Sequence, residues 1–557
     1  MKKIFVLSLS MTVFTIIGFA QTAPARINVD ARQETGRLVP FWTYFGYDEP
    51  NYTYMPDGRK LLSEISRLGP RPVYIRTHNL LTTKEGSPAL KWGFTNVYTT
   101  DDAGNPVYDW TLMDSIMDCY IERGMKPLVE IGFMPRALST HPEPYRHSWE
   151  ENGPLWTGWT YPPADYGQWA ELVYRWVRHS IDRYGRQEVT TWLWQVWNEP
   201  DIGYWSGTFE EYLKLYDYAV DAVKRACPEC RVGGPHTTNP DGQNAGAFLT
   251  GFLEHCLHGT NYATGKEGAP LEFVAFHAKG NPQLVDGHIQ MNMGTQLQAI
   301  EAGFKIVRSF PELQDIPVII GECDPEGCAA CSEERDPRYG YRNGTMYPSY
   351  TAASFAKIYQ LMDEHRINLQ GVLTWAFEFE NQPWFAGFRD LATNGVDKPV
   401  LNVFRMVGLM RGSRLKVEAI SGLSARDVIQ NGVRQQPDIN ALAARDEQSV
   451  TVMIWNYHDN DLPADEAEIE LTISGLSPKP FLLHHYRVDR EFSNAYEAWK
   501  DMGCPQDPDA QQYRELERAG RLQLFTSPQW LAPVDSTLTM QFLLPRQAVS
   551  LLRITRE

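Results

Sequence analysis

Eight short apolar runs alternate with helical patterns between residues 40 and 412, and this alternation constrains the fold more than any other feature. The helical patterns include 60–68, 112–123, 168–184, 209–226, 296–310 and 349–364. The runs predict strands at 41–47, 73–77, 127–131, 192–197, 231–233, 273–276, 317–320 and 372–375. Eightfold alternation is typical of a (β/α)₈ TIM barrel. An open doubly wound sheet is the competing fold, but no glycine-rich phosphate loop follows an early strand. We therefore predict an α/β fold with a catalytic barrel over residues 40–412.

The chain after residue 412 changes to β-rich segments separated by turns. Candidate strands lie at 415–420, 449–457, 466–473, 481–488, 522–525, 538–543 and 549–554. This texture predicts an accessory β-sandwich domain over residues 413–557. The segment 25–29 is also strand-like, so we expect the N-terminal stretch 21–39 to cross over and join that sandwich.

The first twenty residues have the features of a signal peptide. They combine a basic start at Lys2 and Lys3, an apolar centre and the end Gly18-Phe19-Ala20. Cleavage after Ala20 predicts a secreted or periplasmic protein. No later stretch approaches eighteen apolar residues, so we expect no membrane span. The formal net charge of −17 disfavours nucleic acid as a partner, and the sequence does not indicate the oligomeric state.

Two of the predicted barrel strands end in a glutamate. The aromatic run from Trp192 stops at Asn-Glu-Pro, because Pro200 cannot continue a strand, and Glu199 then lies at the carboxyl end of the fourth strand. The run from Pro317 ends in Glu322 at the seventh strand. Two carboxylates on one rim suit glycoside hydrolysis, one as proton donor and one as nucleophile. We expect the charge of Glu322 to hold the proton on Glu199. A spacing of about 5 Å would mean retention of configuration, and about 6.5–9.5 Å inversion.

Other strand ends supply candidate substrate-binding residues. Arg76 and His78 are two residues apart at the end of the second strand, so both side chains face the barrel mouth. His277 and Lys279 have the same spacing after the sixth strand.

Aromatic residues gather after the eighth predicted strand. Trp375 and Phe377, together with Trp384, can form an apolar platform on which one face of a sugar ring stacks.

At these residues the sequence resembles glycoside hydrolase family 39, which holds β-xylosidases and α-L-iduronidases. The matching motifs are Tyr74-Ile-Arg-Thr-His78, Val129-Glu-Ile-Gly-Phe-Met-Pro135, Pro163-Ala-Asp-Tyr-Gly-Gln-Trp169, Trp197-Asn-Glu-Pro200 and the Asp-x-x-x-Ser-Asn-x-x-x-x-Trp signature within 486–499. The resemblance covers nearly the whole mature chain. It implies that Glu199 is the acid/base, that Glu322 is the nucleophile, and that Asn198 and His78 hydrogen-bond the sugar. It also implies retention of configuration, with no metal and no other cofactor.

The sugar is left open by one departure within the family. Many xylosidases of the family carry His-x-Tyr where this chain has His277-Ala-Lys279, which is similar to the iduronidase branch, as is Glu322-Cys-Asp-Pro325. A lysine there can bind a substrate carboxylate. Arg389 does not align cleanly with the arginine that the iduronidase branch adds. Lys279 can instead pair with Asp324 or bind neutral hydroxyls.

A cysteine-rich loop follows Glu322 directly. Two of Cys323, Cys328 and Cys331 are expected to form a disulfide that stiffens the rim. A shared zinc site with Cys227 and Cys230 is disfavoured, because that pair precedes the fifth strand and lies at the opposite face of the barrel.

Together these features predict an exported, retaining, exo-acting glycoside hydrolase whose partner is an oligosaccharide or glycoside. A β-D-xylosidase-like activity is the first interpretation. An α-L-iduronidase-like or α-L-arabinosidase activity is the alternative within enzymes. A non-catalytic glycan-binding protein is the alternative from another class.

Overall fold

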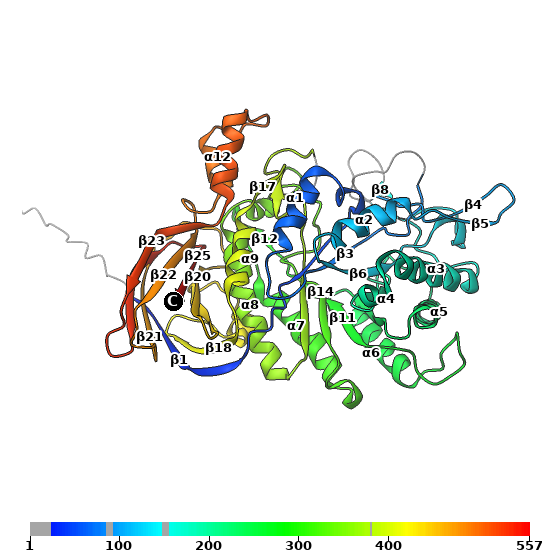
Figure 1. Ribbon diagram of the computed structural model, residues 1–557, viewed down its shortest axis with the longest axis horizontal. Coiled ribbons are helices and arrows are strands. Elements are labelled where there is room, and N and C mark those ends of the chain that lie inside the picture. The colour runs from blue at the N-terminus through cyan, green and yellow to red at the C-terminus, as the bar shows by residue number, and fades with distance from the viewer. Residues whose placement is uncertain (1–23, 85–92, 148–154, 157, 379–380, 557) are drawn as a thin grey trace, which may run out of the picture.

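A computed structural model describes residues 24–84, 93–147, 155–156, 158–378 and 381–556. A barrel and a large curved β-sheet lie side by side (Figure 1). The predicted signal peptide, residues 1–20, lies outside the described residues. Within the described part of the chain, none of the helices is both long and apolar enough to cross a membrane.

Eight parallel strands form a closed barrel, which confirms the predicted fold. In spatial order they are β2 (Tyr44–Tyr47), β3 (Tyr74–Thr77), β6 (Lys126–Ile131), β9 (Leu193–Val196), β10 (Arg231–Thr237), β11 (Phe273–His277), β14 (Val318–Glu322) and β15 (Leu369–Trp375). The ring closes where Leu373 of β15 pairs with Tyr44 of β2. Apolar side chains including Leu128, Leu193 and Ile319 fill the interior. The barrel centre is therefore a packed core, and the space for a ligand lies at the rim.

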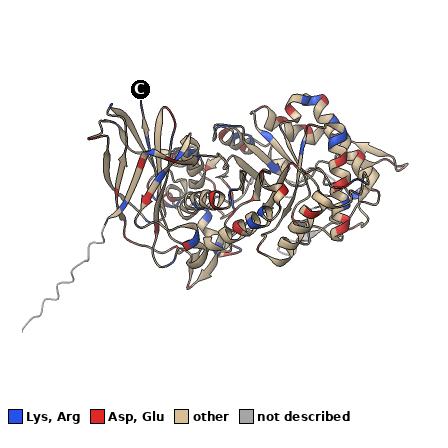
Figure 2. Ribbon diagram, turned by 90° about the horizontal axis from the view of Figure 1, so that it is seen from below, with Lys and Arg blue, Asp and Glu red and all other residues tan. Residues whose placement is uncertain are grey.

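A helix follows each barrel strand. They are α1 (Pro56–Ile65), α2 (Thr111–Ile121), α3 (Tyr166–Tyr184), α5 (Phe209–Ala226), α6 (Gln243–His258), α7 (Met293–Arg308), α8 (Met346–His365) and α9 (Pro399–Leu409), with the short α4 (Arg186–Val189) after α3. N-capping side chains explain where two of these helices begin. Asp165 accepts hydrogen bonds from the first turn of α3, and Thr208 forms a capping box with Glu211 on α5. Acidic and basic residues are interspersed along the outer helices (Figure 2).

The loops of the barrel contain short strands and 3₁₀ turns. Two-stranded pairs are formed by β4 (Tyr98–Thr100) with β5 (Pro106–Tyr108), β7 (Arg146–His147) with β8 (Leu155–Trp156), β12 (Gln283–Val285) with β13 (His288–Gln290), and β16 (Ala392–Thr393) with β17 (Val396–Asp397). The 3₁₀ turns are η1 (Pro50–Tyr52), η2 (Arg136–Leu138), η3 (Pro311–Leu313) and η4 (Pro337–Arg342).

The strand that carries Glu199 ends one residue earlier than its aromatic run. Trp197 and Glu199 have φ angles of 72° and 44°, in the left-handed region that non-glycine residues seldom occupy. Backbone hydrogen bonds from Trp197 to Ile131 and from Glu199 to His236 hold this turn. Such strain persists where the surroundings fix the backbone, and it is common at functional sites.

Nine strands form the accessory sheet in one continuous hydrogen-bonded order. They are β23 (Gln523–Leu531), β22 (Phe481–Val488), β25 (Ala548–Thr555), β20 (Ser449–Tyr457), β19 (Asp438–Arg445), β18 (Ser413–Ala419), β1 (Ala25–Arg37), β21 (Ala467–Ser474) and β24 (Leu538–Leu544). β1 pairs antiparallel with β18 and parallel with β21. The sheet curves around one apolar core that includes Ile27, Ile454 and Leu471.

One strand of this sheet, β19, is absent from the sequence prediction. Its sequence, Asp-Ile-Asn-Ala-Leu-Ala-Ala-Arg, is rich in residues with low strand propensity. It becomes a strand because it pairs with β20 along its full length and with β18 on its other side. A short helix, α10 (Ala425–Asn431), precedes it.

Two helices inserted between β22 and β23 reach back to the barrel, and α12 projects from the molecule (Figure 1). They are α11 (Ala495–Asp501) and α12 (Ala510–Gly520). Asn494 caps α11, and Trp499 packs with Trp384 and Phe385 of the loop after β15. The Ser-Asn…Trp signature thus has a structural role, because it fixes the contact between the two units.

Candidate active site

A cavity of about 170 Å³ opens at the carboxyl ends of the barrel strands. Its lining residues are Asp48, His78, Asn198, Glu199, Tyr204, Lys279, Glu322, Gly327, Cys328, Ala329, Ala330 and Trp375. The structure therefore brings together six of the residues predicted from the sequence. The other four, Arg76, His277, Phe377 and Trp384, do not line the cavity, and Trp384 packs in the cluster that contains Trp499 instead.

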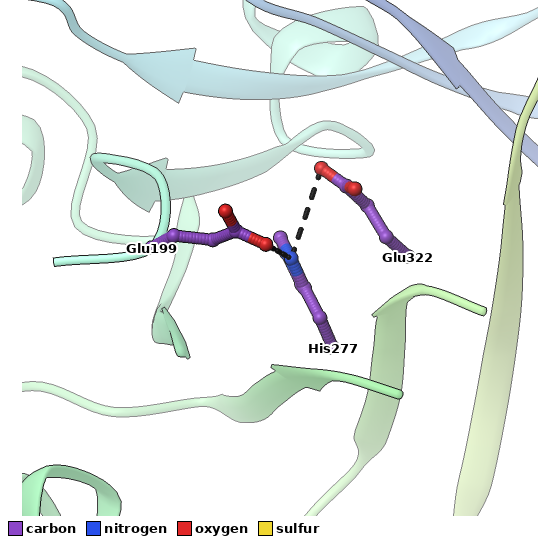
Figure 3. Close-up of side chains that lie close together, drawn as sticks. All are labelled: Glu199, His277 and Glu322. Carbon is purple, nitrogen blue, oxygen red and sulfur yellow. Dashed lines mark hydrogen bonds and ion pairs between the residues drawn. The ribbon is translucent and has the colours of Figure 1, made fainter. Parts of the chain in front are cut away.

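Glu199 and Glu322 face each other across His277 (Figure 3). Oxygen atoms of the two carboxylates and a nitrogen of His277 all lie within 4.8 Å of one another. Glu199 is 8% exposed and Glu322 is 2% exposed. Two carboxyl groups this close in a buried site interact strongly, so the charge of each one depends on the cations around them.

Arg76 lies beneath Glu322 as a fully buried cation. Its Nη1 donates to Oε1 of Glu322 at 2.9 Å, and its Nη2 donates to Oδ1 of Asn198 at 2.7 Å. Nη2 also lies 2.8 Å from Oε2 of Glu130. Arg76 is 0% exposed and does not line the cavity, so its predicted contact with the sugar stays untested. The planar guanidinium instead fixes Glu322 and Asn198 in place from below.

His78 lines the cavity and is held from behind by a third buried carboxylate. Its Nδ1 lies 2.6 Å from Oε2 of Glu130, and its Nε2 lies 3.7 Å from Oε1 of Glu322. Glu130 thus orients His78 and also pairs with Arg76. Glu130 is not among the residues predicted from the sequence, although a charged residue inside the buried strand Lys126–Ile131 is a usable signal.

Lys279 is the cation nearest to both catalytic candidates. Its Nζ forms a very short contact with Oε2 of Glu322 and lies 3.6 Å from Oε1 of Glu199. Burial opposes ionisation of Glu322, but Lys279, His277 and Arg76 hold the pKa of that carboxyl well below its usual range.

The expected proton on Glu199 is not favoured by the charges around it. Burial and the charge of Glu322 raise the pKa of Glu199, but the Lys279 ammonium and the hydrogen bond from His277 outweigh them, so the pKa lies below its ordinary value. Repulsion from Glu322 alone would hold the proton on Glu199, but the Lys279 ammonium lies between the two carboxylates and opposes this effect.

His277 is fully buried behind Glu199 and does not line the cavity, and its predicted contact with the sugar stays untested. Its Nδ1 lies 2.9 Å from Oε1 of Glu199 and 3.7 Å from Oε1 of Glu322. Its Nε2 lies 3.3 Å from Nδ1 of His236. The imidazole therefore contacts the acid/base candidate rather than the cavity.

Trp375 forms an apolar wall of the cavity, as predicted for a sugar platform, and packs against Arg76 and His78. Phe377 does not share that role. It lies 1% exposed in the core, stacked on Tyr47 with ring centroids 3.9 Å apart. The two-residue spacing fails because β15 ends at Trp375, so the side chains no longer alternate beyond that point.

Two further lining residues are missed by the sequence analysis. Asp48 follows the end of β2 directly, and its Oδ1 lies 3.6 Å from Nε2 of His78. The same strand-end signal that identifies Glu199 and Glu322 applies to it. Tyr204 lies on the loop between β9 and α5 and reaches the cavity through the path of that loop, which no sequence pattern indicates.

Comparison with known proteins gives the family. The model of glycosyl hydrolases family 39 matches residues 25–529. This chain belongs to that family. It is accordingly a glycoside hydrolase, and its barrel rim carries the two carboxylates that such chemistry needs.

Relatives of this family 39 enzyme include two named activities. A β-xylosidase from Caldicellulosiruptor saccharolyticus is 27% identical over 511 residues, covering 89% of this chain and 92% of the relative. An α-L-iduronidase from Mus musculus is 25% identical over 525 residues, covering 89% of this chain and 75% of the relative.

Solved structures of the family share the fold. A bacterial orthologue of human α-L-iduronidase superposes with a TM-score of 0.74 at 21% identity, covering 96% of this chain and 84% of the other. A monomeric β-xylosidase from Caulobacter crescentus CB15 superposes with a TM-score of 0.72 at 22% identity, covering 95% of this chain and 99% of the other.

One wall of the family 39 cavity is a loop closed by a disulfide. Cys328 and Cys331 are bonded, which confirms the expected bridge, whereas Cys323 is free. Arg342 holds this loop in place, because it donates to the carbonyl oxygens of Cys328 at 2.6 Å and of Cys331 at 2.9 Å. Cys227 and Cys230 lie below β10, as expected.

The cluster of Glu199, His277 and Glu322 has a spacing that a metal ion can bridge. However, the Lys279 ammonium contacts both carboxylates, and Arg76 binds Glu322 from below. Positive charge is thus already supplied where an ion would sit. The donor set fits acid–base and nucleophilic chemistry better than a metal centre.

Proposed function

We propose that this enzyme is an exo-acting, retaining glycosidase that releases a terminal xylose-like sugar. The spacing of the carboxylates carries the proposal. Oxygens of Glu199 and Glu322 lie within 4.8 Å of each other, close to the value of about 5 Å that is usual for double displacement and well short of the roughly 6.5–9.5 Å of inverting enzymes. The small volume of the cavity, about 170 Å³, supports exo action on one ring at a time.

In this mechanism Glu322 is the nucleophile and Glu199 the acid/base. Arg76 and Lys279 keep Glu322 ionised, so it can attack the anomeric carbon. The bond to the leaving oxygen breaks as Glu199 gives that oxygen its proton and the ester to Glu322 forms. Glu199 then takes a proton from water, which attacks the anomeric carbon and releases Glu322.

Lys279 links substrate binding to the proton on Glu199. A substrate oxygen that binds the ammonium would draw it away from Glu199 and so weaken one of the two interactions that lower the pKa of that carboxyl, the other being the contact with His277. Burial and the charge of Glu322 then favour the proton on Glu199.

The choice of a xylose-like sugar rests on relatives and on charge. β-Xylosidases match over 89% of this chain. Arg389, the nearest second cation in sequence, is 0% exposed and pairs with Glu326 and Asp324. Among the described lining residues, Lys279 is the one lysine or arginine. A single cation beside three carboxylates, those of Asp48, Glu199 and Glu322, favours a neutral sugar.

A uronic sugar is the second candidate. Lys279 lines the cavity with a 14% exposed side chain, and an ammonium there can bind a substrate carboxylate. Relatives named α-L-iduronidase also match over 89% of this chain. An arabinose-containing substrate fits the same cavity. A non-catalytic glycan-binding role is disfavoured, because binding alone needs no pair of opposed carboxylates.

A panel of aryl glycosides tests the substrate. We expect faster hydrolysis of the aryl β-xyloside than of the aryl α-L-iduronide or arabinoside, and the reverse order would refute the xylose-like assignment. For the roles, Glu322→Ala should lose nearly all turnover, and Glu199→Ala should keep glycosylation by activated aryl glycosides with rescue by azide. Mass spectrometry should find a fluorinated sugar trapped on Glu322. Wild-type rates in both variants would show that these residues are not the catalytic pair.

We also propose that the enzyme is exported. The sequence 1–20 supports this, and so does the disulfide between Cys328 and Cys331, because such bonds persist in oxidising compartments. N-terminal sequencing of protein recovered from the periplasm or medium should begin at Gln21.

A further inference from the structure

Two buried histidines extend behind Glu199 on neighbouring barrel strands. His277 on β11 places Nδ1 2.9 Å from Oε1 of Glu199. His236 on β10 places its own Nδ1 3.3 Å from Nε2 of His277. Both side chains are 0% exposed. The three residues form one hydrogen-bonded chain that runs from the cavity into the barrel wall.

Both imidazoles are neutral at neutral pH. Burial lowers the pKa of His277, and burial together with the nearby Arg76 holds the pKa of His236 well below its ordinary value. A neutral imidazole carries one N–H and one acceptor nitrogen. Each histidine therefore donates at one end only, and the chain has a direction.

The charge of Glu199 decides that direction. Burial raises the pKa of Glu199, but Lys279 and His277 lower it below its ordinary value, so the group is a carboxylate, which can only accept hydrogen bonds. Nδ1 of His277 must then carry the hydrogen, and Nε2 must be the acceptor. His236 must in turn donate from Nδ1, which leaves its Nε2 as a bare acceptor. That atom is buried and has no hydrogen-bond partner within the described residues. The assignment as an acceptor fits, because a buried N–H is left unpaired less often than a buried acceptor.

We propose that His236 is a positioning residue for the general acid. By donating from Nδ1 to Nε2 of His277, it stabilises the tautomer that the Glu199 carboxylate requires, so that Oε1 of Glu199 accepts from His277 and the catalytic proton is carried on Oε2. This rests on the proposed acid/base role of Glu199. In glycosylation the proton then leaves Oε2 for the leaving oxygen as its bond to the anomeric carbon breaks and the ester to Glu322 forms.

The barrel is shaped to hold this pair of rings. Gly321, which precedes the nucleophile on β14, leaves the space that His236 occupies, because a Cβ there would lie 2.1 Å from Nδ1 of His236 and 3.2 Å from Cδ2 of His277. The backbone carbonyl of His236 also accepts from the N–H of Glu199 at 2.9 Å. His236 thus contacts the acid/base residue through its backbone and through His277.

Two substitutions of His236 separate donation from packing. The native φ is 56°, which both Asn and Gly tolerate. In His236→Asn the side-chain amide can replace the Nδ1 donor, whereas His236→Gly removes it. We expect His236→Gly to lower kcat/KM for an alkyl glycoside, whose leaving group needs the proton, by about tenfold more than for a dinitrophenyl glycoside. His236→Asn should restore most of the difference. Both glycosides carry the sugar that the wild type cleaves.

Glu199→Ala and His255→Asn serve as reference variants. His255 is also a buried histidine, bonded to Asp217 on the outer helices, and its substitution should slow both glycosides equally. If Glu199→Ala does not discriminate between the leaving groups, the acid/base assignment itself is wrong. If Glu199→Ala discriminates but His236→Gly slows both glycosides by the same factor, the positioning role is refuted.

A measurement without turnover gives a second test. The ¹⁵N chemical shifts of selectively labelled wild-type enzyme report which nitrogen of His277 carries the hydrogen. We expect the hydrogen on Nδ1 in the wild type and in His236→Asn. A hydrogen on Nε2 in the wild type would overturn the inference.

Discussion

Arg76 is the cation on which two buried carboxylates of the barrel depend. Its guanidinium lies 2.9 Å from Glu322 and 2.8 Å from Glu130, and all three side chains are at most 3% exposed. Removing one partner of a buried ion pair costs about 3–5 kcal/mol, because an uncompensated charge is left behind. Lys279 still neutralises Glu322 in an Arg76→Met variant, but Glu130 keeps only His78 and a long hydrogen bond of 3.4 Å from the neutral Gln195 amide. We therefore expect Arg76→Met to lower the free energy of unfolding by about 3–5 kcal/mol.

Chemical denaturation followed by tryptophan fluorescence measures this loss, with Arg183→Met as the matched control. Arg183 pairs with Asp118 at 2.6 Å but is 40% exposed, so its loss should cost less than about 1 kcal/mol. Adding Glu130→Gln to Arg76→Met removes the stranded charge and should recover at least about 1 kcal/mol, as expected for residues in direct contact. If Arg76→Met destabilises no more than the control, the reasoning about the buried charges is wrong.

Three further predictions follow from the site and its surroundings. Burial raises the pKa of Glu199 and the Lys279 ammonium lowers it, so Lys279→Met should move the alkaline limb of the pH profile of kcat/KM to higher pH; an unmoved limb would contradict that role. Trp375→Ala should raise KM, whereas Phe377→Ala should lower stability by about 3–5 kcal/mol with KM unchanged, and matching changes in KM would contradict the separate placement of the two rings. Burial and the contact with Asp397 raise the pKa of Glu64 from 4.5 to about 7, so its contribution to stability is full below pH 4.5 and is lost as the pH rises through 7. A Glu64→Gln variant should flatten the dependence of Tm on pH over that range, and an unchanged slope would refute it.

The barrel follows from local sequence pattern. Each of the eight apolar runs becomes a strand, because a short run buried on both faces between helical patterns has few other ways to satisfy its backbone. Strand β19 shows where such reasoning fails. Its Ala-rich sequence has little strand propensity of its own, and pairing with β18 and β20 makes it a strand.

The site residues also fall into two groups, those predicted from the sequence and those identified only from the structure. By itself the sequence placed Glu199, Glu322, His78, Lys279 and Trp375 at strand ends, and parallel strands in a barrel bring their carboxyl ends to one rim. Those positions depend on the hydrophobic periodicity of each strand and on the order of the strands along the chain, and both can be read from the sequence.

Only the tertiary structure determined which side chains of the site contact one another. It buried Arg76 and His277 below the cavity, packed Phe377 in the core, and placed Lys279 between the two carboxylates. It also joined His236 to the acid/base residue across 37 positions of sequence, from His236 to Glu199. Protonation and charge depend on distances of a few ångströms between residues on different strands, and no local pattern fixes such distances.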